Sequence, residues 1–141
     1  MAESLINVDV VSAEGEIFSG PALMVFLPAS EGDIGIAPRH APLLTLLKAG
    51  EVRVQQPDGT EQFFFVGGGA LEIQPRKVTV LADTAARAHD IDEAAALEAR
   101  KRAEEALAGK IDKIEQAVAL AELARAAAQL RLLEKLRKLK A

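Results

Sequence analysis

The N-terminal part of the chain is patterned as a series of short β-strands. Between Leu5 and Val11 every second residue is apolar, a period of two that is typical of a strand with one buried face. Residues 22–27 form a continuous apolar run, which favours a strand buried on both faces. The alternation recurs in later segments, with turn residues such as Pro57-Asp58-Gly59 between them. Many short strands separated by turns predict a β-sandwich or barrel.

From residue 90 onward the pattern changes to that of helices. Asp90 can cap a first helix, with Glu93 completing a capping box, and we expect this helix to end near Ala108. Gly109 is placed to adopt a left-handed cap, and Asp112 repeats the start signal for a second helix. The chain is therefore predicted to be β plus α, with an antiparallel two-helix hairpin at its C-terminal end.

The amino-acid composition changes at the same boundary, near residue 90. All six prolines, all five phenylalanines and nine of the ten glycines precede residue 90. We expect two domains, a β-sandwich over residues 1–88 and an α-helical hairpin over residues 89–141. The first predicted helix is rich in alanine and poor in large apolar side chains, so little area is buried between the helices. Such a hairpin is closed weakly enough to be opened.

Several classes of function are excluded by what the sequence lacks. It has no cysteine, which excludes thiolate metal sites. It has no tryptophan or tyrosine, and its five phenylalanines form no nucleic-acid-binding motif, which argues against stacking platforms for single strands. Residues 67–69 are three glycines without the lysine of a phosphate-binding loop, so a bulge or a close backbone crossing is expected there. His40 and His89 are not spaced like metal ligands or a catalytic triad. We therefore predict no catalytic residues, no metal site, no nucleic-acid partner and no membrane-inserted segment.

Basic residues gather at the C-terminal end. From Arg125 onward there are six basic residues against Glu134 alone, a net charge of 6 − 1 = +5. Such a segment attracts an acidic partner. The candidate contact residues are Arg125, Arg131, Lys135, Arg137 and Lys138.

A second candidate surface is the loop that follows the buried strand. Glu31 and Asp33 flank Gly32, and Ile34 and Ile36 follow at alternate positions. The two isoleucines can anchor the segment in the core while the carboxylates stay in solvent. We interpret the loop as an acidic protrusion offered to a partner rather than a plain solvated turn.

At this point the order of motifs resembles that of a known family, the epsilon subunit of the bacterial F-type ATP synthase. The resemblance runs nearly end to end and rests on the following segments: Asp9-Val10-Val11-Ser12, Ile17-Phe18-Ser19-Gly20, 31–47, Gly68-Gly69-Ala70-Leu71-Glu72-Ile73-Gln74-Pro75, Val78-Thr79-Val80-Leu81-Ala82-Asp83-Thr84-Ala85 and Ile91-Asp92-Glu93-Ala94.

The resemblance implies a non-catalytic rotor subunit of the central stalk. Its sandwich would have ten antiparallel strands, hold the gamma subunit and sit on the c-ring, coupling proton- or sodium-driven rotation to the catalytic head. By similarity, Glu31 and Asp33 match the loop that meets the c-ring, and His40 lies near the gamma and c-ring contacts. The protein would then be peripheral, at the cytoplasmic face of the inner or plasma membrane.

The resemblance also implies two arrangements of the hairpin, folded or extended into the head, where it blocks ATP hydrolysis. In the extended state the hairpin would contact the alpha and beta subunits, and the basic residues of the second helix would meet an acidic loop of the beta subunits. Some members bind ATP through a motif that here reads Ile91-Asp92-x-x-Ala95-Ala96, with alanine in place of arginine. Loss of that guanidinium weakens anion binding. We expect no cofactor and at most weak ATP contact through Asp92, Arg102 and Arg125.

Two alternatives stay open at this stage. The chain can be a free-standing adaptor whose β-sandwich carries a helical hairpin for an unrelated acidic partner. It can also be a nucleotide-sensing regulator, if the hairpin binds ATP despite Ala95. Association with a gamma subunit and titration with ATP distinguish these hypotheses from the rotor subunit.

Overall fold

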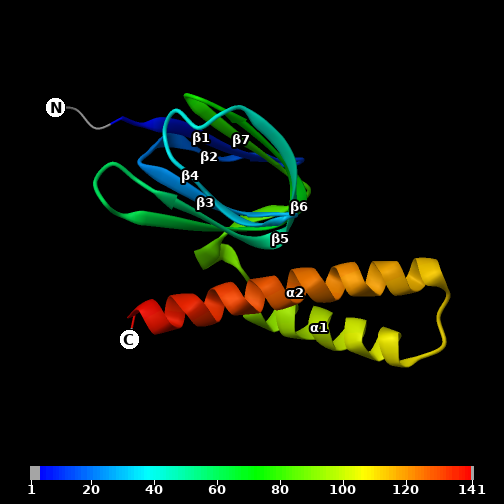
Figure 1. The fold of residues 1–141 in the computed structure, drawn as a ribbon. Helices are drawn as coiled ribbons and strands as arrows, with labels where there is room; N and C mark the ends of the chain where they lie inside the picture. The colour runs from blue at the N-terminus through cyan, green and yellow to red at the C-terminus, as the bar shows by residue number, and fades with distance from the viewer. Residues whose placement is uncertain (1–3, 141) are drawn as a thin grey trace. The chain divides into compact units, whose positions relative to one another are not determined.

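The structure is a computed structural model that describes residues 4–140 and divides into two compact units. The first unit ends at Arg87 and the second begins at Ala88. The first is made of strands and the second of helices (Figure 1).

The first unit contains eight β-strands joined by short turns. Their order across the sheet is β2-β1-β7-β6-β5-β3-β4, and β8 pairs with β6. Every pairing is antiparallel except that of β1 with β7, which is parallel. The strand bounds are β1 Ile6–Ser12, β2 Gly15–Ala22, β3 Met24–Ala29, β4 Gly32–Ile36, β5 Leu43–Gln55, β6 Glu61–Gln74, β7 Lys77–Ala82 and β8 Ala85–Arg87.

The β-sandwich class is confirmed, but residues 4–140 contain eight strands instead of the expected ten. The difference arises in β5 and β6, which are 13 and 14 residues long. The first half of β6 pairs with β8 and its second half with β7, while β3 pairs mainly with the second half of β5. Each long strand thus takes the place of two shorter strands in the ten-stranded sandwich that the resemblance implied.

The core of the sandwich lies between its layers and is built from alternate positions of the strands. The predicted inward residues of β1, Ile6, Val8 and Val10, are all fully buried. Phe64 fills the centre and its ring lies 5.3 Å from that of Phe18. The period of two read from the sequence therefore corresponds to the buried face of the sheet.

Three glycines of β6, residues 67–69, allow a close approach of neighbouring backbone. Gly69 has φ +140°, and a Cβ there would lie 2.1 Å from the carbonyl oxygen of Leu81. The strand register is unbroken on both sides of this segment. The expected close crossing is present. The alternative of a β-bulge is not, because β6 pairs with β5 in one register before and after the glycines.

Asp9 joins three strands through its side chain. Its carboxylate accepts a hydrogen bond of 2.7 Å from the Ser19 hydroxyl on β2 and lies 3.1 Å from Lys77 Nζ on β7. The pKa of Asp9 lies below its ordinary value, chiefly because of the Ser19 hydrogen bond. Burial opposes this shift, and the hydrogen bond to Lys77 and the charge of Lys77 lower the pKa further. The ionised carboxylate therefore helps hold the edge of the sheet.

The second unit is a helical hairpin. A short 3₁₀ turn, η1 Ala88–Asp90, precedes α1 Glu93–Ala108 and α2 Lys113–Lys140. The cap of α1 is Asp92 rather than the predicted Asp90: the Asp92 carboxylate accepts a hydrogen bond from the backbone N–H of Ala95 at 3.1 Å. Gly109 has φ −90° and ψ −179°, so the expected left-handed cap is wrong.

The second helix begins as predicted. Asp112 accepts a hydrogen bond of 2.7 Å from the backbone N–H of Glu115, which satisfies one of the free amide groups in the first turn. Small residues dominate the packing of the hairpin. Ala96 and Ala103 of α1 are buried, as are four residues of α2: Ala119, Ala126, Ala128 and Leu132. The predicted thin helix interface is thus present.

Candidate functional site

The acidic loop is the turn between β3 and β4. Glu31 is exposed, and the side chain of Asp33 is 86% exposed with only a long contact of 4.0 Å to Lys48. Gly32 between them has φ +140°, a conformation that glycine adopts without strain. The turn thus presents two carboxylates to solvent, as the sequence predicted.

Beside this turn lies an apolar surface that we call the leucine patch, defined as Leu44, Leu46 and Leu81. The backbone N–H of Ser30 donates to Leu46 O at 2.8 Å, which fixes the acidic turn next to the patch. Leu46 and Leu81 both pair with Ala70, from opposite sides. Residues paired in this way project from one face of a sheet, so the leucines form a row.

The leucine patch is unusually exposed for its side-chain type. Leu44 is 73% exposed, Leu46 65% and Leu81 51%. Single exposed leucines are ordinary, but a contiguous apolar group beside charged residues marks an interaction site. Sequence reasoning missed the patch, although the run of residues 43–47, with four leucines and one threonine, was a signal for it.

His40 is separate from the acidic turn. It is half-buried in the loop after β4, and its Nδ1 lies 2.7 Å from Ala41 O. Glu31 precedes the start of β4 and His40 follows its end. Because a strand rises about 3.3 Å per residue, the five residues of β4 separate the two by roughly 16 Å. The three residues assigned by resemblance therefore do not form one cluster.

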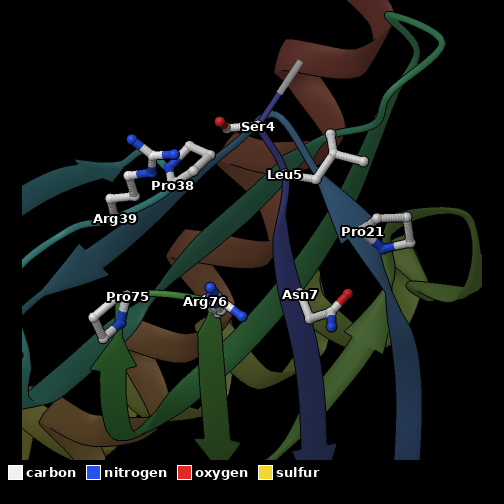
Figure 2. Close-up of a pocket in the computed structure, with 8 residues that line it drawn as sticks. All are labelled: Ser4, Leu5, Asn7, Pro21, Pro38, Arg39, Pro75 and Arg76. Carbon is white, nitrogen blue, oxygen red and sulfur yellow. The ribbon is translucent and has the colours of Figure 1, made fainter. Parts of the chain in front are cut away.

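A surface pocket of about 390 Å³ lies near His40, at the end of the sheet where β1 begins (Figure 2). It is lined by residues from four segments: Ser4, Leu5, Asn7, Pro21, Pro38, Arg39, Pro75 and Arg76. Arg39 comes from the loop after β4 and Arg76 from the turn between β6 and β7. Sequence reasoning missed this pocket because nothing in the local sequence relates the two arginines.

The basic residues of α2 do not all share one face. At 100° per residue, Arg131, Lys135 and Lys138 fall within about 60° of one another, whereas Arg125 and Arg137 lie on other sides. Lys138 pairs with Glu134 at 3.4 Å, within the helix. Arg137 instead pairs with Glu93 of α1, linking the last turn of α2 to the first residue of α1. Arg131, Lys135 and Lys138 therefore form the basic stripe that one partner surface can meet.

The three residues named for weak nucleotide contact lie at different levels of the hairpin. Asp92 caps α1, and Arg102 pairs with Glu98 at 3.6 Å. Ten residues of helix separate Asp92 from Arg102, about 15 Å along the axis. Arg125 lies on α2 twelve residues beyond its start at Lys113, so these groups are distributed along the hairpin rather than gathered around one phosphate.

Residues 4–140 offer neither a membrane-spanning helix nor a metal-binding cluster. Within this part of the chain, no helix is long and apolar enough to cross a membrane. No group of three or more metal-ligating side chains is found among the same residues.

Comparison with known proteins identifies the family. Residues 5–88 match a family model described as the ATP synthase delta/epsilon chain β-sandwich domain. Residues 89–134 match the corresponding long α-helix domain. Together these two matches cover nearly the whole chain.

Similar proteins and structures agree with that assignment. An ATP synthase epsilon chain of Nitrosococcus oceani is 61% identical over 133 residues, covering 94% of this chain and 95% of that protein. One from Alkalilimnicola ehrlichii is 62% identical over 135 residues, covering 96% of each. A chain in the mitochondrial ATP synthase of Euglena gracilis has the same fold, with a TM-score of 0.70 at 17% identity, over 98% of this chain and 82% of that one. The chain belongs to the ATP synthase epsilon-chain family and is a non-catalytic subunit of that complex.

Proposed function

We propose that the chain is a central-stalk rotor subunit whose sandwich attaches to gamma and the c-ring and whose hairpin restrains ATP hydrolysis. The observation that carries the attachment is the leucine patch beside the acidic turn. Burying a leucine contributes about 1.5–3 kcal/mol, so the exposed fractions of three leucines supply several kcal/mol to a complex. The acidic turn then adds charge complementarity toward a second, basic partner surface.

The regulatory half of the proposal rests on the hairpin. The buried residues of its two helices are alanines apart from Leu132, the one large side chain nearly fully buried among residues 88–140. Each buried methyl group contributes little area, so separating the helices costs less than opening a leucine-lined core would. The basic stripe Arg131, Lys135 and Lys138 supplies a surface for an acidic segment of the beta subunits in the extended state.

Several weak contacts are needed to drive such a change. An exposed ion pair contributes about 0–1 kcal/mol, while moving an equilibrium from 1:99 to 99:1 takes about 5.5 kcal/mol. The basic stripe alone supplies at most about 3 kcal/mol on that scale, so burial of α2 in the head must provide the rest. The proposal therefore requires the extended helix to be covered along its length, not only held at its tip.

The proposed location follows from the partners. A subunit held by gamma and the c-ring is peripheral to the membrane, on its cytoplasmic side in a bacterium. Two solved assemblies that contain a chain of this fold, from the mitochondrial ATP synthases of Euglena gracilis and Tetrahymena thermophila, include a c-ring. ATP binding by the hairpin is expected to be weak, because Ala95 stands where a guanidinium would bind phosphate and Arg102 is paired with Glu98.

Binding to the cognate gamma subunit tests the attachment. The full chain and a chain ending at Ala88 should bind gamma with the same dissociation constant, within about twofold. Leu46→Asp should weaken binding at least about tenfold, because it places a charge in the contact. Leu97→Asp, on an exposed helical leucine, is the matched control and should bind normally. Failure of the wild-type chain to bind gamma would favour the adaptor alternative.

A further inference from the structure

The pocket lined by Arg39 and Arg76 has no role in the function proposed so far. Figure 2 shows its eight lining residues, which come from the beginning of β1, the β2 edge, the loop after β4 and the β6–β7 turn. None of the eight is acidic. A pocket with two guanidinium groups and no carboxylate has the chemistry of an oxyanion site.

The other basic side chains of the sandwich are already engaged. Residues 4–87 contain six lysines and arginines. Arg53 pairs with Glu61, Lys77 with Asp9 and, at 4.0 Å, Lys48 with Asp33. Arg87 donates to Ile17 O and lies over the ring of Phe64. Among these six basic residues of 4–87, Arg39 and Arg76 are the two for which the structure shows no side-chain partner, and both line the same pocket.

The backbone holds these two arginines in fixed positions. The N–H of Arg39 donates to Pro75 O at 2.8 Å, which ties the loop after β4 to the residue preceding Arg76. The N–H of Asn7 donates to Arg76 O at 2.9 Å. Arg39 has φ +69°, the one non-glycine residue with positive φ in the described part of the chain. The fold therefore sets the backbone positions from which both side chains extend, and binding has to order only the side chains.

The charge of the sandwich selects among oxyanions. Residues 1–87 carry 6 basic and 11 acidic groups, a net of 6 − 11 = −5. A membrane surface or a polyphosphate presents many negative charges and is repelled by this domain as a whole. A single carboxylate on a protein segment avoids that penalty, and its methylene stem can pack against the pocket's prolines and Leu5.

We infer that the Arg39–Arg76 pocket binds a carboxylate of an acidic segment on the central-stalk partner that the sandwich holds. This inference rests on the proposed function, because it names the chemistry of one contact with gamma. The segment supplies a glutamate, an aspartate or a terminal carboxylate. Its contact lies near His40 and is separate from the acidic turn, on the other side of β4.

The test uses the full chain and two measurements. The first is the dissociation constant for cognate gamma, measured as a function of NaCl. The second is the fluorescence anisotropy of a labelled, C-terminally amidated Gly-Gly-Glu-Gly-Gly peptide, whose one carboxylate reports on the pocket without gamma. The double variant Arg39→Gln/Arg76→Gln should weaken gamma binding about tenfold, flatten its salt dependence and abolish peptide binding. The double variant Arg39→Lys/Arg76→Lys should bind gamma and the peptide with affinities between those of wild type and the glutamine variant, because lysine keeps the charge but not the bidentate geometry of the guanidinium.

Lys77→Gln is the matched control. It also removes one positive charge from the same end of the sheet, but its side chain faces Asp9 and does not line the pocket. It should change both affinities less than twofold. Equal thermal midpoints for wild type and the glutamine variant confirm that the fold is kept.

The two levels of the proposal fail in different ways. If wild-type chain does not bind gamma, the proposed function is wrong, and the peptide measurement still decides whether the pocket takes carboxylates. If gamma binds the double glutamine variant as tightly as wild type, the inference is overturned and the proposed function stands. Binding of anionic phosphatidylglycerol vesicles or inorganic phosphate through the arginines, without an effect on gamma, would also overturn it by assigning the pocket to phosphate.

Discussion

Gly69→Ala is a sharp test of how the long strand β6 is packed. An added Cβ would lie 2.1 Å from Leu81 O and 2.9 Å from Ala82 Cα, far inside contact distance. These are backbone atoms of the paired strand β7, so they cannot move aside as a flexible side chain would. The substitution must therefore separate β6 from β7 or distort both.

The magnitude has two parts. Gly69 has φ +140°, a conformation that costs an L-residue about 1–3 kcal/mol. Forcing an extra carbon into a filled space costs about another 1–3 kcal/mol. The expected loss is about 2–6 kcal/mol, a large part of the 5–15 kcal/mol stability of an ordinary domain.

Gly32→Ala separates the two parts. Gly32 has the same φ of +140°, but nothing lies within 4 Å of its added Cβ. It should lose only the conformational part, about 1–3 kcal/mol. Urea unfolding of both variants, followed by circular dichroism, gives the difference. Equal losses for Gly69→Ala and Gly32→Ala would refute the claim that close packing against β7 requires glycine at position 69.

Three further predictions follow from single contacts. Asp9→Asn should lower stability by about 0.5–1 kcal/mol at pH 7. The pKa of Asp9 is lowered from 3.8. The extra stability of wild type over Asp9→Asn is therefore complete above pH 3.8 and is lost as the pH falls through the lowered pKa. Urea titrations at several pH values measure this difference. Glu93→Gln removes the pair with Arg137 and should increase the opened hairpin population by up to about fivefold, as read from spin labels on α1 and α2; an unchanged distance distribution would contradict this. Leu81→Asp should weaken gamma binding without lowering the thermal midpoint by more than a few degrees, since the side chain is half exposed; unchanged affinity would exclude it from the contact.

The sequence predicted the elements wherever local chemistry decides them. The alternation of Ile6, Val8 and Val10 identifies a buried strand face, and Asp112 is correctly placed as a helix cap. Asp90 and Asp92 both have the side chain of a cap, so pattern alone does not choose between them. In the structure Asp90 lies in a 3₁₀ turn and Asp92 is the N-cap of α1.

The features that were missed depend on pairing between distant segments. Residues 43–47 read as a strand, but the exposure of Leu44 and Leu46 is set by which strands cover β5. Arg39 and Arg76 are 37 positions apart and are brought together by a backbone hydrogen bond of the fold. No local pattern carries that information, because a pocket is a property of the assembled sheet.

ATP hydrolysis by the cognate catalytic head tests the central claim most directly. The head is assayed at saturating concentrations of the full chain and of a chain ending at Ala88, with binding of each verified separately. The account predicts that the full chain suppresses hydrolysis and that the truncated chain binds equally well without suppressing it. If both forms bind and hydrolysis is the same with each, the hairpin is not a brake and the regulatory half of the account is wrong.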